Sequence, residues 1–338
     1  RESAKFTPPK GMRDKRGAIS YLPKSLQKMN SKSQQDPRRL RVRQHIRSRI
    51  RPLAIQFPAV SPRLMVRGEN KLGKLKPLHD PTKEGVLKIV GLMSGTGSNL
   101  RKIIEWAELL KRERGQAVYQ VVAIFSDSSD SMASQIGKEF DLPVIIRDVR
   151  GFYAHRAKPR SDLKLREEFD QETVKALSPF KAKVAAYAGY MSIATWPLIE
   201  AYLGVNVHPA DLSIENIDGR RKFIGSQAVR DAILAGEPYL RSTTHLVEPV
   251  VDAGRILMIS PPLPVILQEP FDPKNQNQVR TIANNHQERL KKAADWIIFP
   301  KTLQYIAEGR YAQDEKGHLF FDGKPIPQGL RLEIEEQG

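Results

Sequence analysis

The chain has 338 residues, with 55 Lys and Arg against 38 Asp and Glu, a formal net charge of +17 at pH 7 and no cysteine. The lack of cysteine excludes disulfide bonds, thiolate metal sites and cysteine nucleophiles. No apolar run is long enough to span a membrane and no secretory signal pattern is visible, so we expect a cytoplasmic protein.

The basic charge lies almost entirely in residues 1–84, which hold 22 Lys and Arg against 6 Asp and Glu and leave a net charge of only +1 for residues 85–338. This segment is rich in Pro, Ser and Gln and has too few aromatic residues to form a core. We therefore predict a flexible basic extension, 1–84, and a folded domain, 85–338. Its clustered arginines would also suit an RNA or ribonucleoprotein anchor, and an organellar leader is a further alternative.

The folded region opens with an apolar run at 86–93, which predicts a buried strand, and apolar residues at helical spacing from Leu100 to Leu110 predict a helix after it. Between them stands Ser94-Gly-Thr-Gly-Ser-Asn99. A glycine turn before a helix suits a phosphate, because the backbone can approach an anion and the first N–H groups point at it. The loop matches neither a P-loop nor a dinucleotide fingerprint, so a plain tight turn is the alternative. The residues expected to hold a phosphate are Gly95, Thr96, Gly97, Ser98 and Asn99.

Short apolar runs then alternate with helical stretches, which predicts an α/β fold with a mostly parallel, twisted sheet and helices on both faces. The strands are expected at 118–125, 143–146, 184–187 and 204–207, and the helices notably at 165–177 and 226–235. Ligands of such sheets bind beyond the carboxyl ends of the strands. We expect the loops 94–99, 189–191 and 206–208 to converge on one crevice for this reason.

The strand at 204–207 runs into Asn206-Val207-His208-Pro209, and Asp252 follows between two strands expected to pair, at 242–248 and 256–259. A carboxamide can hold a developing oxyanion, an imidazole can take a proton near neutral pH, and a carboxylate can orient that imidazole. Together these groups suit acyl transfer to nitrogen, although Asn and His at a strand end also serve to tie down loops. A helix from about 276 to 296 or beyond and a small hairpin near 319–322 complete the chain.

These features resemble the glycinamide ribonucleotide formyltransferase family over about residues 86–329. The matching landmarks are 94–100, Arg166-Glu167 before a helix, Ala188-Gly189-Tyr190-Met191, Asn206-Val207-His208-Pro209, Val251-Asp252-Ala253-Gly254, and the tail 321–329. The resemblance implies the Rossmann-like sheet of that family. It implies no metal.

The resemblance also implies roles for single residues. His208 would be the general base or acid, Asn206 the donor to the formyl oxygen, and Asp252 the support of His208. Arg166 would join residues 95–99 at the substrate phosphate, unless it is an exposed helix arginine, and Asp295 would contact the substrate amine, unless it is a solvated acid. The folate would lie beside Gly189, Tyr190, Met191, Val250, Val251, Ala253 and Gly254.

The implied reaction moves a formyl group from 10-formyltetrahydrofolate, a co-substrate, to the amine of a phosphoribosyl substrate, with glycinamide ribonucleotide of de novo purine synthesis as the leading acceptor. Two departures concern this acceptor: Ser192 stands where the family commonly has arginine, and the loop 210–225 is longer and more charged. A related formyltransferase, a formyl-folate hydrolase, or a non-enzymatic formyltransferase-like component of a ribosome or RNA assembly are the alternatives.

Overall fold

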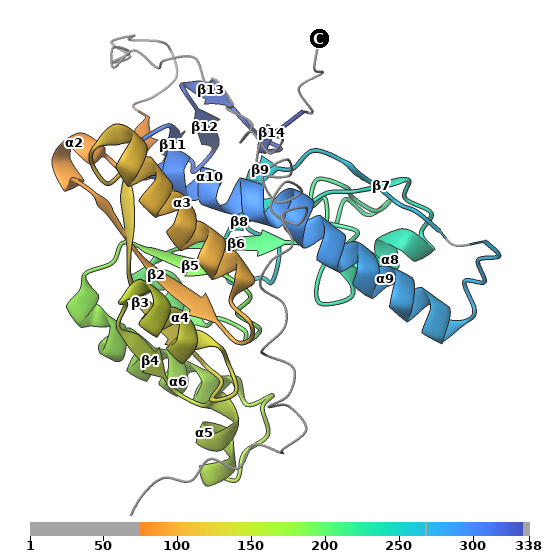
Figure 1. Ribbon diagram of the computed structural model, residues 1–338, viewed down its shortest axis with the longest axis horizontal. Coiled ribbons are helices and arrows are strands. Elements are labelled where there is room, and N and C mark those ends of the chain that lie inside the picture. Colours follow the sequence, from red (N-terminus) through yellow and green to blue (C-terminus); the bar gives the residue numbers. More distant parts are fainter. Residues whose placement is uncertain (1–74, 268, 334–338) are drawn as a thin grey trace, which may run out of the picture. The chain divides into compact units, whose positions relative to one another are not determined.

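The central element of the computed structural model is an eight-stranded sheet with strand order β14-β9-β8-β6-β5-β2-β3-β4 (Figure 1). The structure describes residues 75–267 and 269–333, all within one unit of the chain. The predicted RNA anchor and organellar leader fall almost wholly on residues outside these ranges and stay predictions.

The sheet is mostly parallel, as predicted. Its five parallel strands are β2 (Leu87–Met93), β3 (Tyr119–Ser126), β4 (Val144–Ile146), β5 (Val184–Tyr187) and β6 (Leu203–His208). β8 (Thr243–Leu246) runs antiparallel to both β6 and β9 (Ile256–Ile259), and β14 (Leu330–Arg331) lies parallel to β9. The expected pairing of the strands that flank Asp252 is therefore confirmed.

Helices cover both faces of this sheet, which confirms the second part of the fold prediction (Figure 1). Along β2, Ile89 and Met93 belong to one core cluster and Val90 and Leu92 to another, because successive side chains of a strand point to opposite faces. One face carries α3 (Ser98–Arg114), α4 (Ala133–Phe140) and α10 (Trp296–Ala307). The other carries α5 (Val149–His155), α6 (Leu163–Leu177) and α7 (Trp196–Ala201), with the short helix η1 (Ser178–Phe180) after α6.

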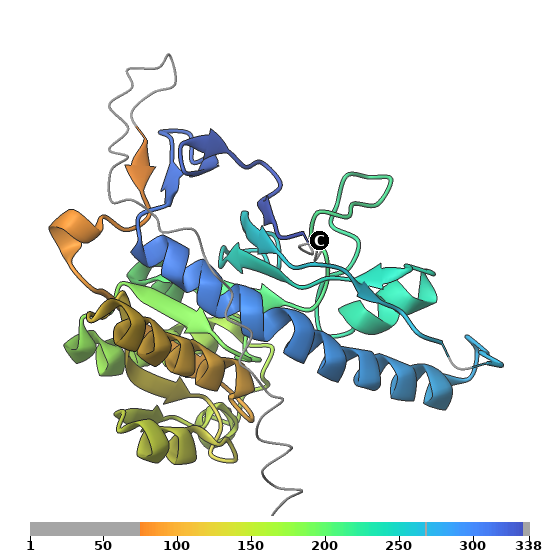
Figure 2. The same cartoon turned by 45° about the horizontal axis from the view of Figure 1, so that its top comes forward.

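A second helical layer extends beyond the sheet. α9 (Gln276–Leu290) continues through a π-helical turn, η2 (Lys291–Asp295), into α10, so that the three form one long rod in Figure 2. α8 (Ala228–Leu234) packs against α9 through a small apolar cluster. The predicted helix at 276–296 or beyond is confirmed, and it runs on to residue 307.

The folded region begins before the predicted boundary at residue 85. β1 (Lys76–Pro77) pairs with β11 (Tyr311–Gln313), α2 (Pro81–Glu84) begins after the N-cap Asp80, and Leu78 is buried in the main core cluster. The assignment of residues 76–84 to the extension is therefore wrong. Elements of two and four residues are too short to show a hydrophobic period in the sequence. They also contain Lys76 and Lys83, so their composition looked like that of the basic extension.

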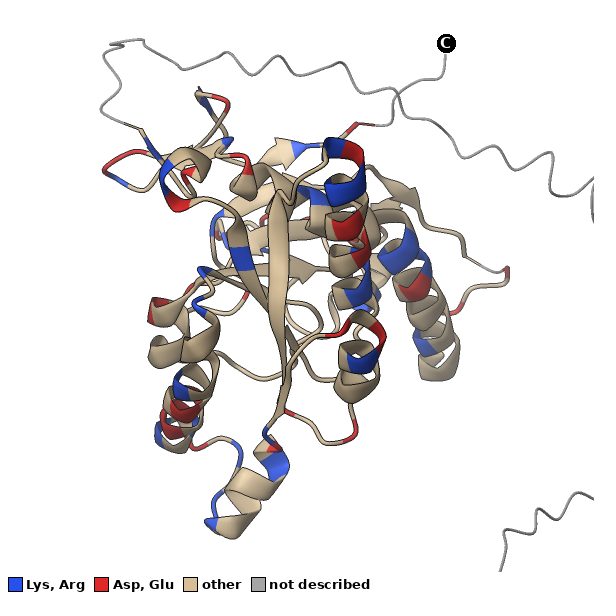
Figure 3. Ribbon diagram, turned by 60° about the vertical axis from the view of Figure 1, so that its left-hand side comes forward, with Lys and Arg blue, Asp and Glu red and all other residues tan. Residues whose placement is uncertain are grey.

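Two small strand pairings belong to the rest of the described part. The predicted hairpin near 319–322 is present as β12 (Leu319–Phe321) and β13 (Lys324–Pro325), and β7 (Tyr239–Leu240) pairs with β10 (Leu263–Pro264). Acidic and basic residues are interspersed over the helices in Figure 3, in keeping with the near-neutral charge of residues 85–338. Among the helices that the structure describes, none combines the length and apolar character that crossing a membrane requires.

Candidate active site

Three polar side chains share one face of the sheet at the end of β6. Asn206 and His208 are two positions apart on β6 and therefore point the same way, while Val205 and Val207 point into the core on the opposite face. His245 on β8 is the cross-strand partner of Asn206 and points to the same side. Its ring Nε2 lies 3.1 Å from the Asn206 amide nitrogen, which donates to it, while His245 Nδ1 donates to the Leu246 carbonyl at 2.8 Å.

Asp252 reaches this group from the loop between β8 and β9. Its Oδ2 lies 3.4 Å from His208 Nδ1 and its Oδ1 lies 3.6 Å from His245 Nε2. The Gly225 N–H donates to Oδ2 at 2.8 Å. His208, His245 and Asp252 are 5%, 3% and 8% exposed. The structure thus brings the three residues predicted from the sequence together and adds His245, which sequence reasoning missed.

Burial and charge set the protonation of this cluster. Burial alone would raise the pKa of Asp252, but the His245 imidazole, the charge of His208 and the Gly225 N–H together lower it to about 2. Burial lowers the pKa of His208, and the Asp252 carboxylate opposes this only in part. At neutral pH the cluster therefore holds an ionised carboxylate beside a neutral imidazole, which is the protonation state that a general base requires.

The charged loop 210–225 closes over His208. The His208 Nε2–H donates to the Phe223 carbonyl at 3.0 Å. Two residues further along the loop, the Gly225 N–H donates to Asp252 Oδ2. Arg221 donates from Nη1 to the Asp252 carbonyl and from Nη2 to the Gly254 carbonyl, the latter at 2.8 Å. Within the loop identified as a departure from the family, Arg221, Phe223 and Gly225 therefore contact the candidate site.

The glycine loop 94–99 leads from β2 into α3 as predicted. Gly97 has a left-handed φ of 67° and precedes the helix without a side-chain cap, which leaves the first helical N–H groups without that partner. The Ser94 N–H donates to the Gly189 carbonyl at 3.0 Å, and the Met191 N–H donates to Ser94 Oγ at 2.8 Å. The loop expected to hold a phosphate and the segment expected to hold folate are therefore direct neighbours.

The loop tolerates substitution very differently at its two glycines. A Cβ at Gly97 would lie 2.4 Å from Ile136 Cδ1 and 2.8 Å from Met93 Cε, whereas a Cβ at Gly95 meets no atom within 4 Å. We expect Gly97→Ala to lower the free energy of unfolding by about 1–3 kcal/mol. Gly95→Val should change it by less than about 0.5 kcal/mol yet raise KM for a phosphate-bearing substrate at least about tenfold, because its side chain hinders the approach of an anion. Denaturant titration and steady-state kinetics measure the two effects; an equal rise in KM for folate would contradict the phosphate assignment.

Asp295 connects the glycine loop to the strands of the site. It accepts hydrogen bonds from Asn99 Nδ2 at 3.3 Å and from Ser242 Oγ at 2.6 Å, and Ser242 precedes Thr243, the cross-strand partner of His208. Asp295 is buried, so the alternative of a solvated acid is wrong. Burial raises its pKa to about 6, although the hydrogen bonds from Ser242 and Asn99 favour the ionised form.

This raised pKa predicts a pH-dependent stability. The folded state holds the Asp295 proton more tightly than the unfolded chain does, so the stabilisation is complete below about pH 4 and is lost as the pH rises through about 6. The free energy of unfolding of the wild type should fall by about 3 kcal/mol over this window relative to that of Asp295→Asn, in which this group does not titrate. Urea titrations of both proteins at pH 4, 6 and 8 measure the difference; parallel curves would show that Asp295 titrates normally.

Arg166 is buried, so the alternative of an exposed helix arginine is wrong. It forms an ion pair with Asp170 at 2.7 Å and donates to the Tyr190 hydroxyl at 2.5 Å. Its hydrogen bonds therefore go to the segment predicted for folate rather than to residues 94–99. A phosphate contact by Arg166 stays a prediction.

The two segments predicted for folate expose apolar side chains. Met191, Val250 and Val251 are 72%, 68% and 53% exposed, and Ala253 is exposed between the buried Asp252 and Gly254. Gly254 must be a glycine, since a Cβ there would lie 1.8 Å from the Leu246 carbonyl oxygen. Exposed apolar groups beside a polar cluster are typical of a site that binds a ligand or a partner. Ser192, the departure from the family, donates to the Asp127 carboxylate.

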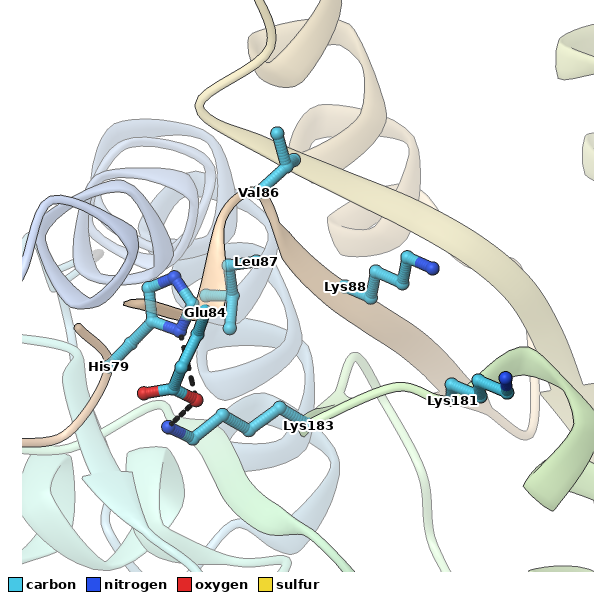
Figure 4. Close-up of a pocket in the computed structure, with 7 residues that line it drawn as sticks. All are labelled: His79, Glu84, Val86, Leu87, Lys88, Lys181 and Lys183. Carbon is cyan, nitrogen blue, oxygen red and sulfur yellow. Dashed lines mark hydrogen bonds and ion pairs between the residues drawn. The ribbon is translucent and has the colours of Figure 1, made fainter. Parts of the chain in front are cut away.

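Two pockets of the described region lie elsewhere. One of about 210 Å³ is lined by His79, Glu84, Lys88 and Lys183 among others, and the His79 and Lys183 side chains both contact Glu84 (Figure 4). Another of about 420 Å³ shares Glu84 and Lys183. Lys183 precedes β5, so both pockets lie at the amino ends of the parallel strands, whereas Asn206 and His208 lie at the carboxyl end of β6. Neither pocket contains a predicted site residue.

Comparison with known proteins gives a consistent result. The Formyl transferase family model matches residues 87–300. The bovine trifunctional purine biosynthetic protein adenosine-3 is 27% identical over 234 residues, covering 69% of this chain and 19% of that protein. The chain spans only 14% to 20% of the length of such trifunctional relatives.

The chain covers nearly the whole length of two other similar proteins. Phosphoribosylglycinamide formyltransferase of Escherichia coli K12 is 24% identical over 246 residues, covering 71% of this chain and 96% of that protein. The solved phosphoribosylglycinamide formyltransferase of Coxiella burnetii aligns with a TM-score of 0.53 at 23% identity, covering 73% of this chain and 99% of that chain. At this identity the structural match shows the fold alone.

Proposed function

Since the family match covers more than half of its residues, the chain belongs to the formyl transferase family, and we propose that it moves a formyl group from 10-formyltetrahydrofolate to the amine of a phosphoribosyl substrate. The observation that carries the proposal is the convergence of Asn206, His208 and Asp252 within the matched region, with 3.4 Å between His208 Nδ1 and the Asp252 carboxylate. Such a donor, base and carboxylate suit acyl transfer to nitrogen.

The residues of the site have separate tasks in this reaction. When bound, 10-formyltetrahydrofolate supplies an electrophilic formyl carbon on its N10 nitrogen. Asn206 donates one amide N–H to His245, and its second N–H is available for the formyl oxygen as negative charge grows there. His208 takes the proton that the attacking amine loses and can return it to N10 as the bond from N10 to the formyl carbon breaks.

The surroundings of His208 support this proton transfer. Asp252 stays ionised beside Nδ1 and stabilises the imidazolium that forms. Nε2, the nitrogen that would face the amine, is hydrogen-bonded to the Phe223 carbonyl. In this hydrogen bond Nε2 carries the proton of the neutral ring. The acceptor amine must therefore displace the carbonyl, and the ring must hold its proton on Nδ1 beside Asp252, before Nε2 can take the proton of the amine.

We propose glycinamide ribonucleotide as the acceptor. The uncapped start of α3 supports a phosphate at residues 95–99, and Asp295, hydrogen-bonded to Asn99, supports a cationic or amine group close to it. The Escherichia coli and Coxiella burnetii relatives are phosphoribosylglycinamide formyltransferases by name. The exposed apolar side chains of Met191, Val250 and Val251 favour a folate site beside the cluster.

A transfer assay tests the proposal. The full chain is incubated with 10-formyltetrahydrofolate and, in separate reactions, glycinamide ribonucleotide, other primary amines with and without phosphate, and no amine. Folate absorbance and product mass are followed together. Formylation confined to the phosphoribosyl amine supports the proposed acceptor, formylation of another amine would reassign it, and formate release without amine would indicate a hydrolase.

A further inference from the structure

The loop over His208 contains a stiff turn that directs Arg221 inward. The Asn216 side-chain oxygen accepts from the N–H groups of Asp218 and Arg220 at 3.0 and 2.9 Å, and the Asn216 N–H donates to the Arg220 carbonyl at 2.8 Å. Ile217 at the tip of this turn is fully exposed. We call residues 215–225 the strap.

Arg221 joins the strap to the turn that carries Asp252. Its two amino groups donate to the carbonyls of Asp252 and Gly254, on either side of Ala253. Asp252 has a left-handed φ of 54°, a conformation that is strained for a residue with a side chain. A bidentate guanidinium that binds both flanking carbonyls resists relaxation of this turn, and with it movement of the carboxylate away from His208.

Arg221 also acts on His208 through its charge. The charged or titratable groups that face His208 are Asp252, His245 and Arg221. A cation close to an imidazole disfavours its protonated form, which opposes the effect of the Asp252 carboxylate. Arg221 is itself faced by Asp252, Glu248 and Glu215. Its charge therefore helps to keep His208 in the neutral form that accepts a proton.

We propose that Arg221 is a positioning residue, which clamps the Asp252 turn against His208. The proposal rests on the formyl transfer proposed above, because it assigns Arg221 a part in that site. It predicts separable effects of geometry and charge. Arg221→Gln removes both, Arg221→Lys keeps the charge and loses the paired hydrogen bonds, and Arg220→Gln, at an exposed neighbour in the same strap, is the matched control.

The kinetic test uses the full chain with 10-formyltetrahydrofolate and glycinamide ribonucleotide between pH 5 and 9. Arg221→Gln should lower kcat about 10- to 100-fold with little change in KM for folate, since a small misplacement of catalytic groups has an effect of this order. The acid limb of its kcat/KM profile should move to higher pH, because loss of the cation raises the pKa of His208. Arg221→Lys should lower kcat without moving the acid limb. Arg220→Gln should match the wild type.

A second measurement is independent of turnover. Imidazole resonances of His208, followed by NMR over the same pH range, should titrate at higher pH in Arg221→Gln than in the wild type or in Arg220→Gln. If the wild type transferred formyl to no acceptor, the proposed function would fail while this titration still decided the role of Arg221. Equal titration curves and equal rates for Arg221→Gln and Arg220→Gln would overturn the proposal. Should Arg221→Gln not fold, wild-type kcat in Arg221→Lys would overturn it instead.

Discussion

Replacing His208 by alanine should lower kcat for formyl transfer by about two to four orders of magnitude. The neighbouring imidazole of His245 is not free to take its place, because its Nδ1 is bound to the Leu246 carbonyl and its Nε2 to Asn206. The Asp252 carboxylate would stay ionised, but its low pKa makes it a weak base for an amine proton. Single-turnover kinetics at saturating substrates measure the chemical step without interference from product release.

The control for this loss is His318→Ala. His318 is exposed just before β12, and its side chain pairs with Asp314, so its removal should leave kcat unchanged. Circular dichroism and thermal unfolding of both variants separate lost chemistry from lost fold. Turnover of His208→Ala within a few-fold of the wild type, with both proteins folded, would show that His208 is not the base.

The sheet was predictable because its central strands are buried on both faces. β2, β3, β5 and β6 are nearly continuous apolar runs, which mark parallel strands under helices, and their bounds differ from the predicted ones by a residue or so. The small strands β1, β7, β10 and β14 contain two residues each and have no period to read. Their pairing depends on distant parts of the chain and becomes visible only in the folded structure.

The site was predictable only in part. The spacing of Asn206 and His208 already places them on one face of a strand, and Asp252 was expected between two pairing strands. The family resemblance then implied the role of each residue. The position of His245 depends on the register between β6 and β8, which no local pattern specifies. A histidine inside the expected strand at 242–248 was the one available signal.

The remaining contacts of the site had weaker signals. Phe223 contributes its backbone carbonyl and Gly225 its backbone N–H. Almost every residue carries these groups, so the sequence cannot single out these two positions. The pairing of Arg166 with Asp170 did have a signal, since opposite charges four residues apart on a helix are neighbours. The spacing of four residues indicated that Arg166 pairs with Asp170 and is not left free to bind the substrate phosphate.

Replacing Asn206 by alanine should lower kcat by about two to three orders of magnitude, which is the effect of removing one donor from an oxyanion site. KM for folate should change little, because the donor strengthens its bond only as charge grows on the formyl oxygen. Asn206→Asp should lose at least as much activity, since a carboxylate of the same size accepts hydrogen bonds, cannot donate one, and repels the developing charge. Comparison of the two variants in single-turnover kinetics separates donation from packing.

Asn284→Ala is the matched control, because Asn284 is exposed on α9. It should keep wild-type kcat and KM. Asn206 also donates to His245, so Asn206→Ala could act by releasing His245 rather than by removing the oxyanion donor. The Asp variant distinguishes these causes, since a carboxylate at 206 would accept a hydrogen bond from the His245 ring and hold it in place while still failing to stabilise the oxyanion. If Asn206→Asp recovered most of the activity lost in Asn206→Ala, Asn206 would act through His245 and the oxyanion role would be wrong.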